Sequence, residues 1–192
     1  FLNKKQSPAG FLPAWLDARR PHPRGQAEQF RNPSRHMESW RFGAPGNESL
    51  EHVEAAPPAA PETLAPIIRE RASMPEALRI VYANGLPVSI PEELPEGLSV
   101  MDMEDFVLQC PDTARKYLET ETETLGSEKL SALTTALQHN GLVIMADREI
   151  SLPLEILHFI SGDNVAVFPS TLLIAETGSR LHILERHLSA DH

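Results

Sequence analysis

The chain has 192 residues, 41% of them apolar, and its 27 acidic residues outnumber 17 basic ones to give a formal net charge of −10. Because the basic residues are spread along the chain, this balance argues against a nucleic-acid partner. No apolar run approaches the roughly 20 residues of a membrane helix, and the single cysteine, Cys110, excludes an internal disulfide and favours the reducing cytoplasm.

The first part of the chain shows a helical period that prolines interrupt. Four apolar residues share one face of a short helix: Phe11, Ala14, Trp15 and Ala18. Residues 43–61 are rich in Pro and Ala and predict an extended linker, and a second short helix is expected over 62–71. We therefore predict a helical N-terminal region over residues 1–75. The chain begins without Met, so a lost targeting segment stays an open alternative.

Residues 76–140 predict a mixed connecting segment. A strand is expected over residues 78–83, and Asn84-Gly85 tolerates the positive φ angles of a tight hairpin turn. Three helical segments are expected after the hairpin: residues 103–108, 112–119 and 127–139.

Apolar runs of strand length fill the last third of the chain, residues 141–192. Polar or Gly-containing breaks separate them, as at residues 161–164 and 176–179. Short strands that recur at such close intervals along the sequence indicate a sandwich, a barrel or a coiled β-solenoid. The chain stops just past an expected strand, so we expect it to be a truncated piece of a larger protein.

Three segments, in this order, resemble the SufB/SufD family of the SUF iron–sulfur cluster assembly system, and SufD more than SufB. The first, Pro33 to Phe42, has a Pro-Ser-Arg start, an acidic residue and then Trp-Arg-Phe. The second is the strand and Asn-Gly turn from Ile80 to Gly85. The third runs from Leu130 to Ser189, where a helix leads into successive strands. Gly43 departs from the threonine that the family commonly has after the first segment.

The resemblance implies an α+β fold: a helical N-terminal region followed by the first turns of a right-handed parallel β-helix over residues 141–192. It places the rest of the β-helix, and the helices that dock the SufC ATPase, beyond His192. The implied function is a non-enzymatic scaffold subunit with a SufB-like subunit and a SufC-like ATPase as partners. The complex as a whole would handle the iron–sulfur cluster, so no cofactor is expected here. Flavin binding and the choice between self-pairing and pairing with a paralogue stay open.

Two alternatives belong to other functional classes. One is a cupin-like metal-dependent enzyme with His158 and His182 around the metal, and the other is a plain β-solenoid binding module. A cupin is expected to show clustered histidines on facing strands, whereas this chain has isolated ones. The sequence also lacks a phosphate-binding loop of the Gly-x-x-x-x-Gly-Lys-Ser/Thr type, so any nucleotide hydrolysis is expected to come from a partner.

Three histidines, His158, His182 and His187, are the candidate metal ligands. Imidazoles on neighbouring strands can converge on a metal, but His182 and His187 point to opposite faces of a regular strand. A structural role is therefore favoured for all three. Cys110 alone cannot supply the about four ligands of a cluster. We accordingly predict no catalytic, cofactor-binding or metal-binding residues.

Two further groups are weighed as interaction sites. Trp40, Arg41 and Phe42 suit a partner contact because Trp and Arg often anchor interfaces, but packing of Trp40 within the protein is favoured. Glu185 and Arg186 are adjacent on a strand and therefore face opposite sides. They are expected to be charged side chains at the edge of a strand ladder rather than a catalytic pair.

Overall fold

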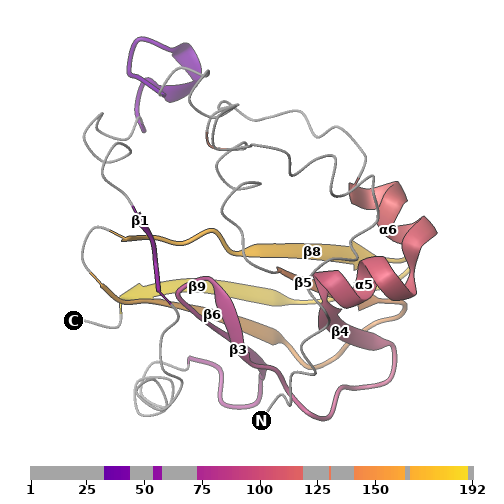
Figure 1. Cartoon of the computed structure of the whole chain (residues 1–192). Coiled ribbons are helices and arrows are strands. Elements are labelled where there is room, and N and C mark those ends of the chain that lie inside the picture. The colour runs from indigo at the N-terminus through magenta and orange to yellow at the C-terminus, as the bar shows by residue number, and fades with distance from the viewer. Residues whose placement is uncertain are drawn as a thin grey trace.

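The computed structural model describes residues 33–43, 54–57, 73–118, 130, 141–162 and 165–189. In chain order, these residues form the 3-10 turn η1 (Glu38–Trp40), β1 (Glu54–Ala55), β2 (Leu78–Ala83), β3 (Leu86–Ser89), β4 (Leu98–Asp102), α5 (Met103–Gln109), α6 (Pro111–Leu118), β5 (Gly141–Ala146), β6 (Leu154–Ile160), β7 (Val165–Ala166), β8 (Ser170–Ala175) and β9 (Ile183–Ser189). Figure 1 shows the strands stacked in layers, with both helices at one side.

Two sheets carry most of the structure. One has the strand order β3-β2-β6-β9, the other has the order β4-β5-β8, and the short strands β1 and β7 form a separate pair. The pairs β2–β6, β6–β9 and β5–β8 are parallel, whereas β2–β3 and β4–β5 are antiparallel. Both larger sheets are therefore mixed and open.

The predicted α+β fold, with a helical N-terminal region and a right-handed parallel β-helix, is wrong for the described residues. Strands dominate the described residues, in which α5, α6 and the single residue Leu130 are α-helical. Residues 33–43 contain only the 3-10 turn η1. The helices expected over residues 11–18, 62–71 and 127–139 lie outside the described residues, apart from Leu130. Both sheets are mixed because each contains one antiparallel pair. A tight turn joins β2 to its antiparallel neighbour β3, and β4 runs in the direction opposite to β5.

The predicted hairpin at Asn84-Gly85 is confirmed. Both residues have positive φ, 49° for Asn84 and 81° for Gly85, which is the backbone that a two-residue hairpin turn needs. The Asn84 side chain also donates to the carbonyl oxygen of Pro57 at 2.7 Å and accepts from the Ser161 amide at 2.9 Å. The turn therefore connects the hairpin to the segment after β1 and to the end of β6.

The parallel pairs β5–β8 and β6–β9 share one register. Gly141 of β5 lies beside Ser170 of β8, and Leu154 of β6 lies beside Ile183 of β9, so partners are 29 residues apart in both sheets. Gly141 is required at its position because a Cβ atom there would lie 2.7 Å from the Ser170 carbonyl oxygen. This spacing brings side chains that are distant in the sequence into rows across neighbouring strands.

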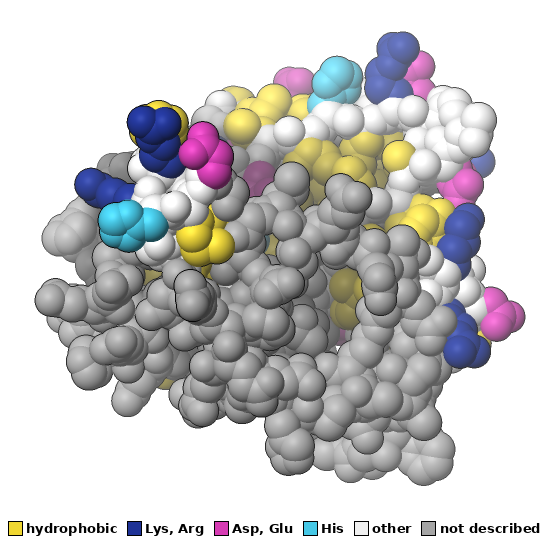
Figure 2. Space-filling model, turned by 90° about the horizontal axis from the view of Figure 1, so that it is seen from above, with side chains coloured by type: hydrophobic (Ala, Val, Ile, Leu, Met, Phe, Trp, Pro, Cys, Tyr) yellow, Lys and Arg dark blue, Asp and Glu magenta, His cyan; other side chains and the backbone are white. Residues whose placement is uncertain are grey.

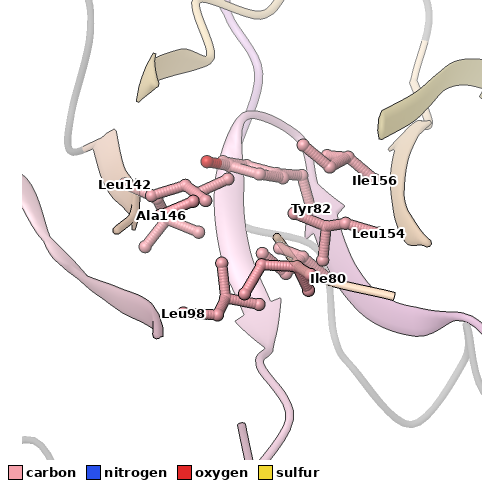
Figure 3. Close-up of a cluster of buried hydrophobic side chains, with 9 residues drawn as sticks. Ile80, Tyr82, Leu98, Leu142, Ala146, Leu154 and Ile156 are labelled. Atoms are coloured by element: carbon pink, nitrogen blue, oxygen red, sulfur yellow. The ribbon is translucent and has the colours of Figure 1, made fainter. Parts of the chain in front are cut away.

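The main core lies between the two sheets. Side chains of β2 and β6 point toward those of β4 and β5 (Figure 3). The buried members are Ile80, Tyr82, Leu98, Leu142, Ile144, Ala146, Ile150, Leu154 and Ile156. Burial of one such aliphatic side chain stabilises the fold by about 1.5–3 kcal/mol.

Helices α5 and α6 cover the other face of the sheet β4-β5-β8. Phe106 and Val107 of α5 and Ala114 of α6 pack with Val143 of β5 and Ile174 of β8. Because both faces of β5 are covered, its apolar run does not alternate with polar residues.

Candidate functional site

Three rings form a row across β2, β6 and β9. The strand register places Tyr82 beside His158 and His158 beside His187. The Tyr82 and His158 ring centroids lie 4.5 Å apart, and those of His158 and His187 lie 4.4 Å apart with 8° between the ring planes. The row follows from parallel pairing, since strand neighbours in register are separated by about 4.8 Å.

A carboxylate joins the two histidines at the edge of this row. Oε1 of Glu185 lies 2.7 Å from Nε2 of His158 and 3.9 Å from Nε2 of His187. Glu185 occupies the position that Ile80 and Ile156 occupy on the preceding strands, and its side chain is half-exposed. Two imidazoles and one carboxylate thus converge.

The surroundings of His158 favour the neutral form of its ring. Its side chain is only 3% exposed, and this burial lowers the pKa of His158, an effect that the hydrogen bond with Glu185 opposes and the neighbouring His187 reinforces. Because a carboxylate only accepts hydrogen bonds, Nε2 carries the proton. The buried Nδ1 atom then has no hydrogen-bond partner among the described residues.

Tyr82 closes the buried end of the row. Its hydroxyl lies 3.1 Å from Oγ1 of Thr171 on β8, so the side chain connects the two sheets. Burial raises the pKa of Tyr82 to about 12. The phenol therefore stays protonated at neutral pH and acts as a structural hydrogen-bonding group.

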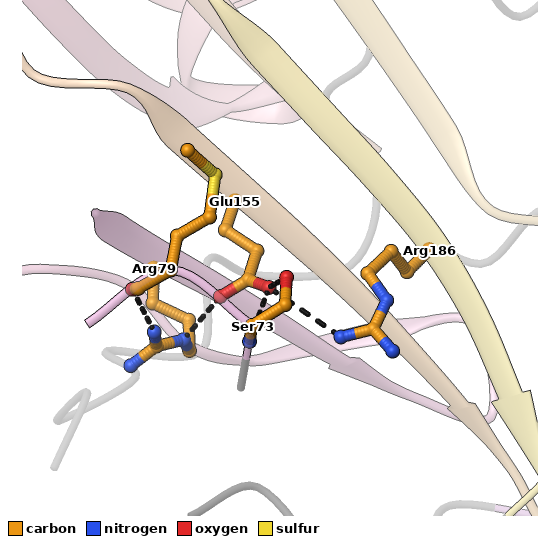
Figure 4. A network of polar contacts seen from close by, with 5 residues as sticks. Ser73, Arg79, Glu155 and Arg186 are labelled. Carbon is orange, nitrogen blue, oxygen red and sulfur yellow. Dashed lines mark hydrogen bonds and ion pairs between the residues drawn. The ribbon is translucent and has the colours of Figure 1, made fainter. Parts of the chain in front are cut away.

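A second polar cluster lies on the opposite face of β6, around Glu155 (Figure 4). This fully buried carboxylate accepts hydrogen bonds from the Ser73 amide at 3.0 Å, the Ser73 hydroxyl at 2.7 Å and Nε of Arg79 at 2.9 Å. Arg186 approaches it at 3.6 Å. Burial by itself raises the pKa of Glu155, but the bonds from Ser73 and Arg79 prevail and hold that pKa below its usual value. The cluster keeps a buried charge paired.

A depression of about 480 Å³ lies beside this second cluster, between residues 73–77 and 151–153. Ser73, which contacts Glu155, is at its edge, and the lining is otherwise formed by Met74, Pro75, Ala77, Leu152 and neighbouring residues. Glu76 is the only titratable side chain among the lining residues that the structure describes. The lining brings together no acid–base pair.

The remaining sequence candidates lie apart from the histidine row. His182 is exposed and does not belong to the group formed by His158, Glu185 and His187. The cupin-like hypothesis paired His158 with His182, whereas the structure pairs His158 with His187. Cys110 is half-buried at the end of α5 and packs with the helices.

The aromatic segment and the charged pair also have defined positions. Trp40 is half-buried, whereas Phe42 is 94% exposed, with the Arg41 guanidinium 5.4 Å from its ring centroid. Glu185 contacts His158 and Arg186 approaches Glu155, so the two adjacent charges do face opposite sides of β9. On the face shown in Figure 2, basic and acidic side chains of the described residues are interspersed, with apolar side chains between them.

Sequence reasoning missed the pairing of His158 with His187 and the role of Glu185. The available signal was the 29-residue spacing, which also separates Leu142 from Thr171 and Leu157 from Arg186. Sequence identity between the paired strands is too low for this spacing to appear as a repeat. Among the helices that the structure describes, none is long and apolar enough to cross a membrane.

Comparison with known proteins gives one consistent similarity. No protein-family model matches the chain. Over 97 residues the chain is 31% identical to iron–sulfur cluster assembly SufBD family proteins of Mycobacterium bovis and of two strains of Mycobacterium tuberculosis. The aligned stretch is 50% of this chain and 11% of each relative, so the chain spans only a small part of their length. The similarity is to SufBD family proteins in general and does not separate SufD from SufB.

Proposed function

We propose that the chain acts in iron–sulfur cluster assembly as a SufD-like, non-enzymatic scaffold subunit in the cytoplasm. The observation that carries the proposal is the 31% identity over 97 residues to SufBD family proteins. The order of the segments from Pro33 to Phe42, Ile80 to Gly85 and Leu130 to Ser189 adds support. Because the chain covers 11% of those relatives, its partners and its role in a complex are part of the proposal.

The polar interior of the described residues suits a structural role. Glu155, the fully buried carboxylate, is held by the Ser73 hydroxyl, the Ser73 amide and Arg79 rather than directed into a cavity. Tyr82 is bonded across the two sheets to Thr171. Groups that are paired in this way stabilise one arrangement of strands, which is what a scaffold requires.

The outer strands offer surface for a partner. Leu173 of β8 is 47% exposed and Leu184 of β9 is 38% exposed, and these strands are at the ends of the strand orders. Among the described residues these are the outer strands of their sheets, and exposed apolar side chains on outer strands favour protein contacts. In the proposed complex a SufB-like subunit pairs with this protein, and a SufC-like ATPase supplies nucleotide hydrolysis.

Co-expression tests this proposal. The protein carrying an affinity tag is produced together with the SufB-like subunit and the SufC-like ATPase of the same genome. We expect the SufB-like subunit to copurify in a stoichiometric complex, and we expect a deletion strain to lose activity of iron–sulfur enzymes while cluster-independent enzymes keep theirs. Purification without either protein, together with unchanged iron–sulfur enzymes in the deletion strain, would refute the proposal.

A further inference from the structure

Three side chains of the kinds that bind transition metals meet where β6 adjoins β9. They are His158, Glu185 and His187, and one donor atom from each lies within 4.8 Å of the other two. We propose that these residues form a binding site for a first-row divalent metal ion. Imidazole nitrogen and carboxylate oxygen are suitable ligands for Zn²⁺ and Fe²⁺, and three protein ligands leave a coordination position for water. The inference is independent of the proposed scaffold function.

The placement of the cluster combines a fixed ligand with two accessible ones. His158 is held between the rings of Tyr82 and His187 and is 2% exposed. The side chains of Glu185 and His187 are 49% and 56% exposed on β9, the last strand in the order β3-β2-β6-β9. An ion can therefore reach the cluster from the β9 side.

The geometry needs only a small change in the exposed side chains. Zinc binds imidazole nitrogen at about 2.0–2.1 Å, so two ligand atoms of a tetrahedral site lie about 3.3 Å apart. Oε1 of Glu185 and Nε2 of His158 already lie 2.7 Å apart, whereas the same oxygen is 3.9 Å from Nε2 of His187. The His187 ring is stacked parallel to the His158 ring, so it must turn to direct its lone pair at a shared ion. Its exposure permits this rotation.

The position of the proton on the His158 ring affects the expected affinity for a metal ion. In the metal-free protein, Nε2 of His158 donates to Glu185, and Nδ1 has no partner among the described residues. Metal binding needs the Nε2 lone pair, so the proton must move to Nδ1. Metal-binding histidines usually donate that second proton to an acceptor, and loss of such a partner lowers affinity by about 10–100-fold. We therefore expect Zn²⁺ to bind about 10–100-fold more weakly than at a site whose buried histidine proton has an acceptor.

Titration of the metal-free protein with Zn²⁺ tests the site. After removal of any histidine tag and treatment with chelator, calorimetry at pH 7.5 should show one Zn²⁺ per chain. His187→Ala and Glu185→Gln should each weaken binding by at least about tenfold, because each removes one of three ligands. His182→Ala is the matched control: it removes an exposed histidine of the same segment that is outside the cluster, and it should bind Zn²⁺ like the unmodified chain.

A second measurement separates loss of the site from loss of the fold. Co²⁺ bound to this cluster should give the visible absorption of a four- or five-coordinate ion, and His187→Ala should remove that absorption while far-UV circular dichroism stays unchanged. His187 is suitable because it is exposed, whereas replacement of buried His158 would disturb packing. Absence of stoichiometric Zn²⁺ binding, or equal affinity in His187→Ala and the unmodified chain, would overturn the proposal.

Discussion

Replacement of Arg79 by Met gives the most direct test of the buried charge cluster. Arg79 donates from Nε to Glu155 at 2.9 Å and from a terminal guanidinium nitrogen to the Met74 carbonyl oxygen at 2.8 Å. Met keeps much of the side-chain length and removes both bonds and the charge. The fully buried Glu155 carboxylate then retains the two bonds from Ser73 and the more distant Arg186.

The expected loss of stability is about 3 kcal/mol. A hydrogen bond to a charged group contributes about 1.5–3 kcal/mol, and removal of one partner of a buried ion pair costs about 3–5 kcal/mol. We take the low end of the second range because Ser73 and Arg186 still face the carboxylate. In a domain of this size, 1 kcal/mol corresponds to about 2–4 °C in Tm, so Tm should fall by about 6–12 °C.

Urea denaturation followed by circular dichroism measures the free energy of unfolding, and a double-mutant cycle identifies the cause. Adding Glu155→Gln to Arg79→Met removes the unpaired charge, so the double variant should be more stable than additivity predicts by at least about 1 kcal/mol. Arg180→Met is the matched control, because Arg180 forms an exposed ion pair with Glu149 at 3.1 Å and such pairs contribute little. A loss below about 1 kcal/mol for Arg79→Met, or strict additivity in the cycle, would show that the reasoning about Glu155 is mistaken.

Three further outcomes are expected. Because the pKa of Glu155 is lowered in the folded state, the carboxylate contributes to the free energy of unfolding above the ordinary carboxyl pKa of about 4.3, and this contribution is lost as pH falls through the folded-state pKa. When Tm is measured against pH, it should therefore fall more steeply in this acid range for the unmodified chain than for Glu155→Gln. Equal slopes for the two proteins would count against this. Gly141→Ala should destabilise the protein by about 1–3 kcal/mol in urea titrations, because its Cβ would meet the Ser170 carbonyl oxygen at 2.7 Å; an unchanged midpoint would contradict the close approach of β5 to β8. Leu173 of β8 and Leu184 of β9 are exposed on outer strands, so we expect the chain produced without a partner to self-associate through them. Leu173→Lys and Leu184→Lys should therefore reduce concentration-dependent association in sedimentation velocity; association that persists unchanged in both variants would contradict this assignment.

Local patterns were sufficient for several elements of this protein. Asn84-Gly85 predicts a turn because only a few residue types tolerate positive φ, and the structure has both residues in that conformation. Helices α5 and α6 lie within a residue or so of their predicted ranges, 103–108 and 112–119. The apolar runs after Gly141 become β5, β6, β8 and β9. These features depend on neighbours in the sequence, so the sequence carries their signal. The domain boundaries at residues 75 and 140 stay a prediction.

Pairing between strands was decided only by the tertiary structure. The sequence does not indicate that β4 runs antiparallel to β5, and the 29-residue spacing that pairs β6 with β9 is too weak a signal to be recognised before the register is known. Consequently the contact between His158, Glu185 and His187 could not be predicted, although the alternation that separates Glu185 from Arg186 could. Glu155 shows the same limit: its position in β6 predicts the face it lies on, but its burial depends on Ser73, 82 residues earlier in the chain, and on Arg79. Sequence periodicity indicates the side of a strand that a residue occupies, whereas register and the segments that cover a sheet follow from contacts between distant residues.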